Sequence, residues 1–258
     1  MPSYVIHRGT SEIDRTSRIV VIATVSNANR KTGDMLQTYI LLEDVPPMEG
    51  VKTGADSAIC GGCVHRGNGK DGTGRTCYVN LAHGPRVVYA SYRAGGLPDI
   101  SHDPAAINAL GNGRVVRLGT YGDPVAVPLN VWRNLLAGSI GRSGYTHQWR
   151  AAKFAAFRPI LQASCDTPGD FERARASGWG TFTTVPVGGT LPGALLCPAS
   201  AEAGTSQGLG LPQGLLKRVQ CVDCLMCDGA SQRHVYIPAH GASRKRYTGK
   251  RQALQVLA

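Results

Sequence analysis

The stretch RVVRLGTYGDPVAVPLNVWRNLLAGSI, residues 114–140, decides the fold expected for this chain. It opens with a short apolar run that reads as a buried strand and ends abruptly in glycine and aspartate. Pro128 then introduces a segment whose apolar residues recur at helical spacing, and proline is favoured in the first turn of a helix. A strand followed by a helix forms one βα unit, whose usual setting is a parallel sheet covered by helices.

Similar units lie on both sides of this stretch. Further strands are expected at residues 76–81, 144–149, 161–166, 179–187 and 234–241. Helices are expected at residues 87–96, 151–160 and 170–178, the last one capped by Asp170. Near the start of the chain, two β-branched runs joined by the turn-like NRKTGD (29–34) predict an antiparallel hairpin.

These elements predict an α/β protein built as a full or partial (β/α) barrel of the TIM type. An N-terminal β-hairpin extension is expected at residues 1–50, and the barrel at 51–240. The barrel carries a cysteine-rich insertion at 190–230, which is expected to form a C-terminal metal knuckle. Residues 241–258 form a basic tail without acidic residues, which is either a contact segment or a frayed terminus.

Composition and charge restrict the class of protein. The chain has 258 residues, 42% of them hydrophobic, and no apolar run approaches the ~20 residues of a membrane span. The formal net charge of +11 favours a polyanionic partner such as nucleic acid, because neutralising phosphates releases counterions. A basic protein that merely stays dissolved is the alternative, since charge alone decides little.

Seven of the eight cysteines fall into two groups, which suit a soft metal or an iron–sulfur cluster. The first group is Cys60, Cys63 and Cys77, and the second is Cys197, Cys221, Cys224 and Cys227. The opening MPSYVIHRGTSEIDR lacks the apolar core of a signal peptide, so we expect a cytoplasmic protein, in the host cytoplasm if it is viral. In a reducing compartment, closely spaced cysteines are more often metal ligands than disulfides.

Polar residues end several of the expected strands, and strand ends are where barrel enzymes hold their sites. These residues are Asn80, Gly122-Asp123, His147-Gln148, Cys165-Asp166 and His240. As a set facing one rim they indicate an active site, with Asp123, His147 and Asp166 as the candidate catalytic residues. Gly119 and Gly122 permit close approach of a ligand, whereas Asp123-Pro124 could instead be a turn that caps the next helix.

The three early cysteines followed by a glycine-plus-acid strand end resemble the radical SAM enzymes. The resemblance implies that Cys60, Cys63 and Cys77 hold a [4Fe–4S] cluster that binds S-adenosylmethionine, with Gly122 and Asp123 at the amino group of that cofactor. The chain also resembles uncharacterised bacteriophage proteins that share its CY, GD and late Cys-x2-Cys-x2-Cys signatures. The spacing here is Cys-x2-Cys-x13-Cys, whereas the superfamily has Cys-x3-Cys-x2-Cys.

Other interpretations remain open. Cys60, Cys63 and Cys77 with His65 or His83 would make a closed zinc site. The late cysteines would hold zinc or a second iron–sulfur cluster, with His234 or His240 able to replace one ligand.

A weaker resemblance links the chain to tRNA-guanine transglycosylases and their DNA-acting phage relatives. It implies that Asp123 or Asp166 is the nucleophile of a base exchange, with Tyr78, Tyr121 and Tyr145 holding the extruded base. We therefore expect a metal- or iron–sulfur-dependent enzyme of radical SAM type that modifies a nucleic acid base or nucleotide. The alternatives are a zinc-containing base-exchange transferase and a zinc-stabilised nucleic-acid-binding protein without catalysis.

Overall fold

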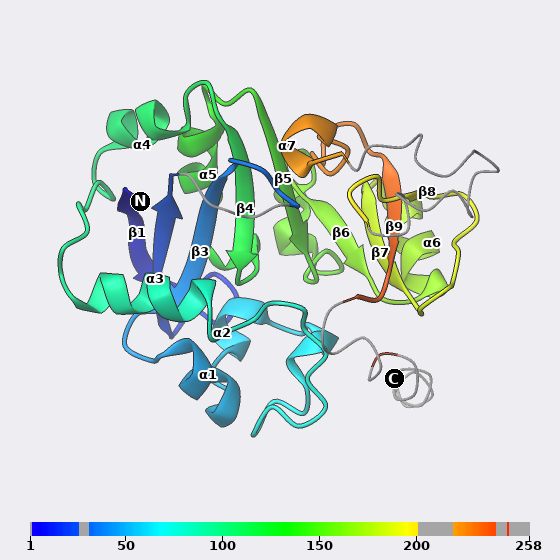
Figure 1. The fold of residues 1–258 in the computed structure, drawn as a ribbon, viewed down its shortest axis with the longest axis horizontal. Helices are drawn as coiled ribbons and strands as arrows, with labels where there is room; N and C mark the ends of the chain where they lie inside the picture. Colours follow the sequence, from blue (N-terminus) through cyan, green and yellow to red (C-terminus); the bar gives the residue numbers. More distant parts are fainter. Residues whose placement is uncertain (1, 26–30, 201–218, 241–246, 248–258) are drawn as a thin grey trace.

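The computed structural model describes residues 2–25, 31–200, 219–240 and 247, which fold around one mixed sheet (Figure 1). Its strands are β1 (Ser3–Thr10), β2 (Arg18–Thr24), β3 (Leu36–Leu42), β4 (Val115–Tyr121), β5 (Gly141–Thr146), β6 (Gln162–Cys165), β7 (Thr181–Val185), β8 (Leu195–Leu196) and β9 (His234–Pro238). The strand order is β1-β2-β3-β4-β5-β6-β7-β9-β8. Pairing is antiparallel from β1 to β3 and parallel from β3 onward, which confirms the α/β class.

The sheet is open. β1 and β8 stand at the two ends of the strand order and do not pair with each other within the described ranges. A closed barrel requires hydrogen bonds between its first and last strands. Of the two expected forms, the full barrel is therefore not formed by these strands.

The predicted N-terminal hairpin is present as β2 and β3, which pair from Ile19 with Leu42 to Thr24 with Gln37. Strand β1 was not predicted from the sequence, and it adds a third antiparallel strand at the edge. Because β3 also pairs with β4, the hairpin continues directly into the parallel part of the sheet. Nearly every residue of β2 and β3 is buried, since both of their faces are covered.

Helices occupy most of the connections between strands. They are α1 (Pro47–Thr53), α2 (Ser57–Cys60), α3 (Gly84–Arg93), α4 (Pro104–Gly111), α5 (Leu129–Leu136), α6 (Pro168–Ala176) and α7 (Cys221–Cys224), with 3-10 turns η1 (Val64–Arg66), η2 (Pro124–Ala126) and η3 (Ala152–Phe157). The helix expected after Pro128 is α5, and its fully buried Trp132 donates a hydrogen bond from Nε1 to the Pro124 carbonyl at 2.8 Å. This contact fixes α5 against the end of the strand that precedes it.

Three local expectations were wrong. Residues 76–81 form an irregular segment instead of a strand. Residues 151–160 contain the 3-10 turn η3 where an α-helix was expected. The cap of α6 is Thr167, whose hydroxyl accepts a hydrogen bond from the Asp170 amide, because the helix begins at Pro168.

The long connection from β3 to β4 places the first cysteine group. It contains α1 to α4 and the glycine-rich loop of residues 61–77, and in Figure 1 α1 and α2 lie below the strands of the sheet while α7 lies above them. No helix in the described ranges is long and apolar enough to cross a membrane. The basic residues of the tail, including Arg244 and Lys245, lie outside the described residues.

Candidate active site at the carboxyl ends of the strands

A cavity opens at the carboxyl ends of the parallel strands. Its walls come from α2 and the glycine-rich loop on one side and from β4, β5, β6, β7 and β9 on the other. The sequence-predicted site residues that line it are Cys60, Cys63, His65, Cys77, Tyr78, Gly119, Tyr121, Gly122, Asp123, Tyr145, His147 and His240. Residues more than eighty positions apart in the chain therefore meet in one place, as expected for this edge of a parallel sheet.

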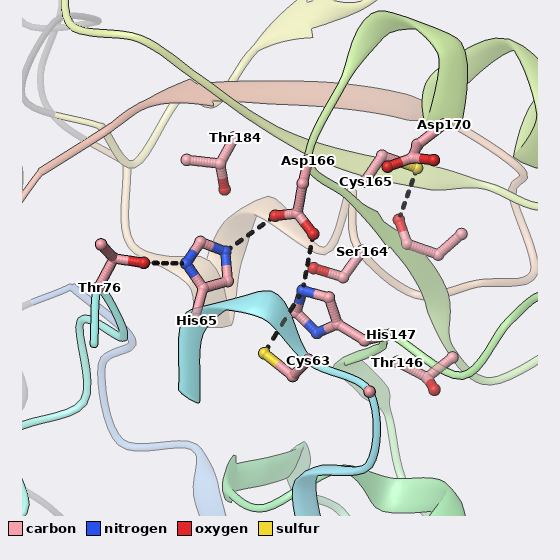
Figure 2. A network of polar contacts seen from close by, with 12 residues as sticks. Cys63, His65, Thr76, Thr146, His147, Ser164, Cys165, Asp166, Asp170 and Thr184 are labelled. Atoms are coloured by element: carbon pink, nitrogen blue, oxygen red, sulfur yellow. Dashed lines mark hydrogen bonds and ion pairs between the residues drawn. The ribbon is translucent and has the colours of Figure 1, made fainter. Parts of the chain in front are cut away.

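Asp166 joins this wall through two histidines (Figure 2). His65 Nε2 lies 2.9 Å from Asp166 Oδ1, and His147 Nε2 lies 3.3 Å from Asp166 Oδ2. Asp166 follows β6 directly, His147 follows β5, and His65 belongs to η1. The Thr76 hydroxyl lies 2.9 Å from His65 Nδ1 and so fixes the orientation of that ring.

The charges in this group reinforce one another. Burial alone would raise the pKa of Asp166, but the charge of His147 and hydrogen bonds from both histidines hold it well below its usual range. Burial opposes the imidazolium form of His147, yet the Cys63 sulfur and the Asp166 carboxylate raise its pKa well above the usual value. The side chains of His147 and Asp166 are 18% and 8% exposed, so solvent screens this pair only weakly.

Cys63 completes the group, but not as a catalytic triad would. Its sulfur lies 3.7 Å from His147 Nε2, the same nitrogen that faces Asp166. In a nucleophile–histidine–carboxylate triad, the nucleophile and the carboxylate bind different ring nitrogens. Side chains that converge on one point from three directions are instead arranged like ligands around an ion.

The donor atoms of His65, His147 and Asp166 all lie within 4.8 Å of one another. Two imidazole nitrogens and a carboxylate suit zinc, and the same set with open positions suits non-haem iron(II). No other group of three histidine, cysteine or acidic ligand atoms in the described ranges meets this distance. The residues present therefore fit a single transition-metal ion.

Cys60 and Cys77 line the same cavity, but their sulfurs do not belong to the group of ligand atoms within 4.8 Å of one another. Burial, followed by the neighbouring Cys63 and Cys77 sulfurs, raises the pKa of Cys60 well above its usual value. Burial also raises the pKa of Cys77, against the charge of Arg75. The three sulfurs are not within the distance expected for ligands of one ion. In an iron–sulfur cluster the cysteines bind different irons, so wider spacing is compatible with that cofactor.

Asp123 is a buried anchor in the wall of the cavity. Its carboxylate accepts hydrogen bonds from the Thr146 hydroxyl at 3.0 Å, the His147 amide at 2.9 Å and the Val125 amide at 3.2 Å. Burial raises the pKa of Asp123, and these donors oppose that shift. Asp123 thus caps the turn that follows it, as the alternative expected, by accepting a hydrogen bond from the Val125 amide. The same carboxylate also binds the backbone amide of His147.

Gly119 and Gly122 are explained by backbone geometry beside the cavity. Both have positive φ, 65° and 83°. A Cβ at Gly119 would lie 2.6 Å from the Gly122 carbonyl oxygen, and one at Gly122 would lie 2.7 Å from Ile40 Cβ. These glycines let β4 turn sharply into η2 and place Asp123 below the rim.

The second cysteine group forms a separate neighbourhood. Cys197 is buried with Ala199, Val235 and Ile237, and Cys221 and Cys227 pack against this cluster. Burial raises the pKa of Cys197, Cys221 and Cys227, the last to about 12. Cys165, the lone cysteine, is fully buried in β6 and lies in neither group.

Several expected residues lie elsewhere or play other roles. Asn80 accepts a hydrogen bond from the Ala82 amide and does not line the cavity. Tyr121 lines the cavity but is only 4% exposed, whereas Tyr78, which also lines it, is 59% exposed. His83 precedes α3 outside the cavity.

His65 was expected only as an extra zinc ligand, and its pairing with Asp166 was not predicted. Tyr247, whose ring stacks on His65 with centroids 6.0 Å apart, was also missed. The signal available was the Cys-x-x-Cys-x-His spacing, which places His65 two residues beyond Cys63. Nothing in the sequence identified the partner, because Asp166 is 101 positions away.

Comparison with protein-family models, curated proteins and solved structures finds no match for this chain.

Proposed function

We propose that this chain is a metal-dependent enzyme whose reaction centre is the cavity at the carboxyl ends of β4, β5 and β6. The observation that supports this most is the group of His65, His147 and Asp166, whose ligand atoms lie within 4.8 Å of one another. Three separate segments supply these side chains, and a chance surface cluster would not be buried or oriented by Thr76. An ion held here would act as a Lewis acid or activate bound water.

The chain's own residues supply the rest of the chemistry in this proposal. His65, His147 and Asp166 hold the ion, and Cys63 lies close enough to add a sulfur ligand or to move a proton with His147. Asp123 acts as a positioning residue, because it holds the His147 backbone and does not face the ion directly.

The proposed substrate is a nucleic acid base or nucleotide. Tyr78, Tyr145 and Phe182 line the cavity, and aromatic rings stack well on bases. The net charge of +11 would draw a polyanion toward the site in a salt-dependent way. A reducing cytoplasm, the host cytoplasm if the protein is viral, is the proposed setting.

A radical SAM-type enzyme is the second candidate, and a different observation favours it. Cys60, Cys63 and Cys77 line one cavity together with Gly119 and Gly122, the strand end that the resemblance places at the cofactor. In this version a [4Fe–4S] cluster on the three cysteines would bind S-adenosylmethionine and supply radical chemistry. The open sheet would then correspond to a partial barrel, closed in part by the cysteine-rich knuckle.

The contacts of Asp123 and Asp166 give less support to the base-exchange alternative. It needs a carboxylate free to attack, whereas the Asp123 carboxylate accepts several hydrogen bonds and the Asp166 carboxylate lies against two histidines. A binding protein without catalysis would not explain why His65, His147 and Asp166 converge in the cavity. In every version the late cysteines are proposed to hold a second metal centre.

Anaerobic purification followed by elemental analysis and absorption spectroscopy tests the proposal. The mononuclear version expects a colourless or weakly coloured protein that loses one metal equivalent on His147→Ala, with exposed His102→Ala as the matched control. The radical SAM version expects a brown protein with iron and sulfide that is lost on Cys60→Ser. Metal content unchanged in both cavity variants would exclude the cavity as a metal site.

A further inference from the structure

Arg75 is a cation in the wall of the cavity that has no acidic partner among the described residues. Arg66, which also lines the cavity, is paired with Asp56 Oδ1 at 2.6 Å. Arg75 instead donates hydrogen bonds to two main-chain carbonyl groups, that of Cys77 at 3.4 Å and that of Val79 at 3.1 Å. No carboxylate in the described ranges lies within ion-pair distance of it. Because a guanidinium has five N–H donors, Arg75 keeps its charge and further donors for a ligand.

Tyr78 supplies a second hydrogen-bond donor three residues further along the chain. It is exposed and lines the cavity, and its hydroxyl lies 3.2 Å from Arg117 Nη2. Arginine can only donate, so the Tyr78 oxygen is the acceptor in this contact. The hydroxyl proton of Tyr78 is therefore directed away from Arg117, and no group in the described part of the chain accepts it.

Both donors are held in place before any ligand binds. Arg117 is buried in β4, where it donates to the Ser143 hydroxyl at 3.3 Å and lies over the Tyr145 ring, 4.6 Å from its centroid. It thereby fixes the hydroxyl of Tyr78, while Arg75 binds the carbonyl groups on either side of the same residue. Donors that are already ordered lose little conformational entropy when a ligand binds.

We propose that Arg75 and Tyr78 form an anion subsite that takes a phosphate group of the substrate. The charge and the remaining N–H groups of Arg75 suit phosphate oxygens, with which arginine forms strong charge-assisted hydrogen bonds. The Tyr78 hydroxyl would donate to another oxygen of the same phosphate. A nucleotide would therefore be bound in preference to the corresponding nucleoside.

The subsite adjoins the group of His65, His147 and Asp166. Thr76 follows Arg75 directly in the chain, and the Thr76 hydroxyl lies 2.9 Å from His65 Nδ1 (Figure 2). The phosphate would thus be held on the side of the cavity that carries these ligand atoms. Assigning the phosphate to a nucleotide rests on the proposed function, whereas the anion subsite itself does not.

Isothermal titration calorimetry tests the subsite, with AMP, GMP, CMP and UMP as probes, each measured beside its own nucleoside. At least one nucleotide is expected to bind the wild-type protein about 10-fold more tightly than its nucleoside, and Arg75→Gln is expected to remove this difference. Arg114→Gln is the matched control, because Arg114 also donates to a main-chain carbonyl, that of Leu110 at 3.0 Å, but does not line the cavity. No preference for any nucleotide, or equal effects of the two substitutions, would overturn the subsite.

Tyr78→Phe tests the second donor without disturbing the carbonyl groups that Arg75 binds. It removes the hydroxyl and keeps the ring, so nucleotide affinity is expected to fall about 3- to 10-fold and nucleoside affinity to stay unchanged. An equal loss for nucleotide and nucleoside would overturn the role of Tyr78 at the phosphate.

The His147→Ala protein separates this inference from the proposed function. Its preference for nucleotides is expected to persist, whereas its metal content reports on the cavity ion. A preference that persists beside unchanged metal content would support the subsite while the proposed metal site fails. Loss of the preference in His147→Ala would show that the ion, and not Arg75, holds the phosphate, and would overturn the inference.

Discussion

His65 Nε2 lies 2.9 Å from Asp166 Oδ1, although 101 positions separate the two residues in the chain. One comes from the glycine-rich connection after β3 and the other from the end of β6. Their contact closes the connection over the carboxyl edge of the sheet, and His147 joins them from β5. Because of these contacts, the ligand atoms of His65, His147 and Asp166 converge on one site.

Replacing Asp166 by asparagine is expected to empty the cavity site. The amide keeps the shape of the side chain but loses the charge that binds a cation and sustains the charged form of His147. We expect metal content to fall by about one equivalent, with little change in the metal held by the late cysteines. Elemental analysis of Asp166→Asn beside Cys165→Ala, a buried cysteine outside both groups, provides the measurement and its control.

Replacing Asp123 by alanine is expected to destabilise the protein. The change leaves the Thr146 hydroxyl and the His147 amide without their acceptor, and a buried unsatisfied donor costs about 1–3 kcal/mol. Urea unfolding measures the loss. Unchanged stability together with abolished activity would show that Asp123 acts on the substrate directly.

Replacing Gly122 by alanine is expected to be more damaging than the same change at Gly74. Both residues have positive φ, 83° and 77°, so both substitutions carry a similar backbone strain of about 1 kcal/mol. Only the new Cβ at Gly122 meets other atoms, 2.7 Å from Ile40 Cβ, whereas nothing lies within 4 Å at Gly74. Thermal melting of the two variants should therefore differ, and equal melting temperatures would contradict this account of the strand end.

Asp99 is expected to make stability depend on acid pH. Burial would raise the pKa of Asp99, but hydrogen bonds from Ser101 and Arg8 outweigh it and lower the pKa. A lowered folded-state pKa contributes stability above the unfolded value of about 3.9, and that stability is lost as pH falls through the folded pKa. Asp99→Asn should flatten this part of the stability profile, by less than about 1 kcal/mol because the pair with Arg8 is one-third exposed. Parallel acid slopes for variant and wild type would argue against the pair.

Much of the fold could be predicted because each element carried a local signal. The β-branched runs around NRKTGD gave β2 and β3, and the 114–140 stretch gave β4 and α5. Strand β1 was missed because SYVIHRGT lacks clean alternation. Residues 76–81 were misassigned because their local pattern resembles a short strand, whereas the sheet contains no strand at these positions.

The site was predicted in part for the same reason. Polar strand ends identified His147 and Asp166, since the carboxyl edge of a parallel sheet gathers them. His65 could not be paired with Asp166 from sequence, because the fold of the glycine-rich loop determines where η1 lies. The burial of Asp123 could not be predicted from the sequence either, since it depends on Thr146 and on the turn made possible by Gly119 and Gly122.

Metal-edge X-ray absorption of anaerobically purified Cys224→Ser protein tests the central claim most directly. This change is directed at the late cysteine site, so that the spectrum reports the cavity ion. The account predicts one metal per chain with nitrogen and oxygen neighbours, histidine outer-shell scattering that disappears in His65→Ala, and at most one sulfur. An all-sulfur shell with iron–iron scattering, unaltered by His65→Ala, would contradict it and assign the cavity to an iron–sulfur cluster.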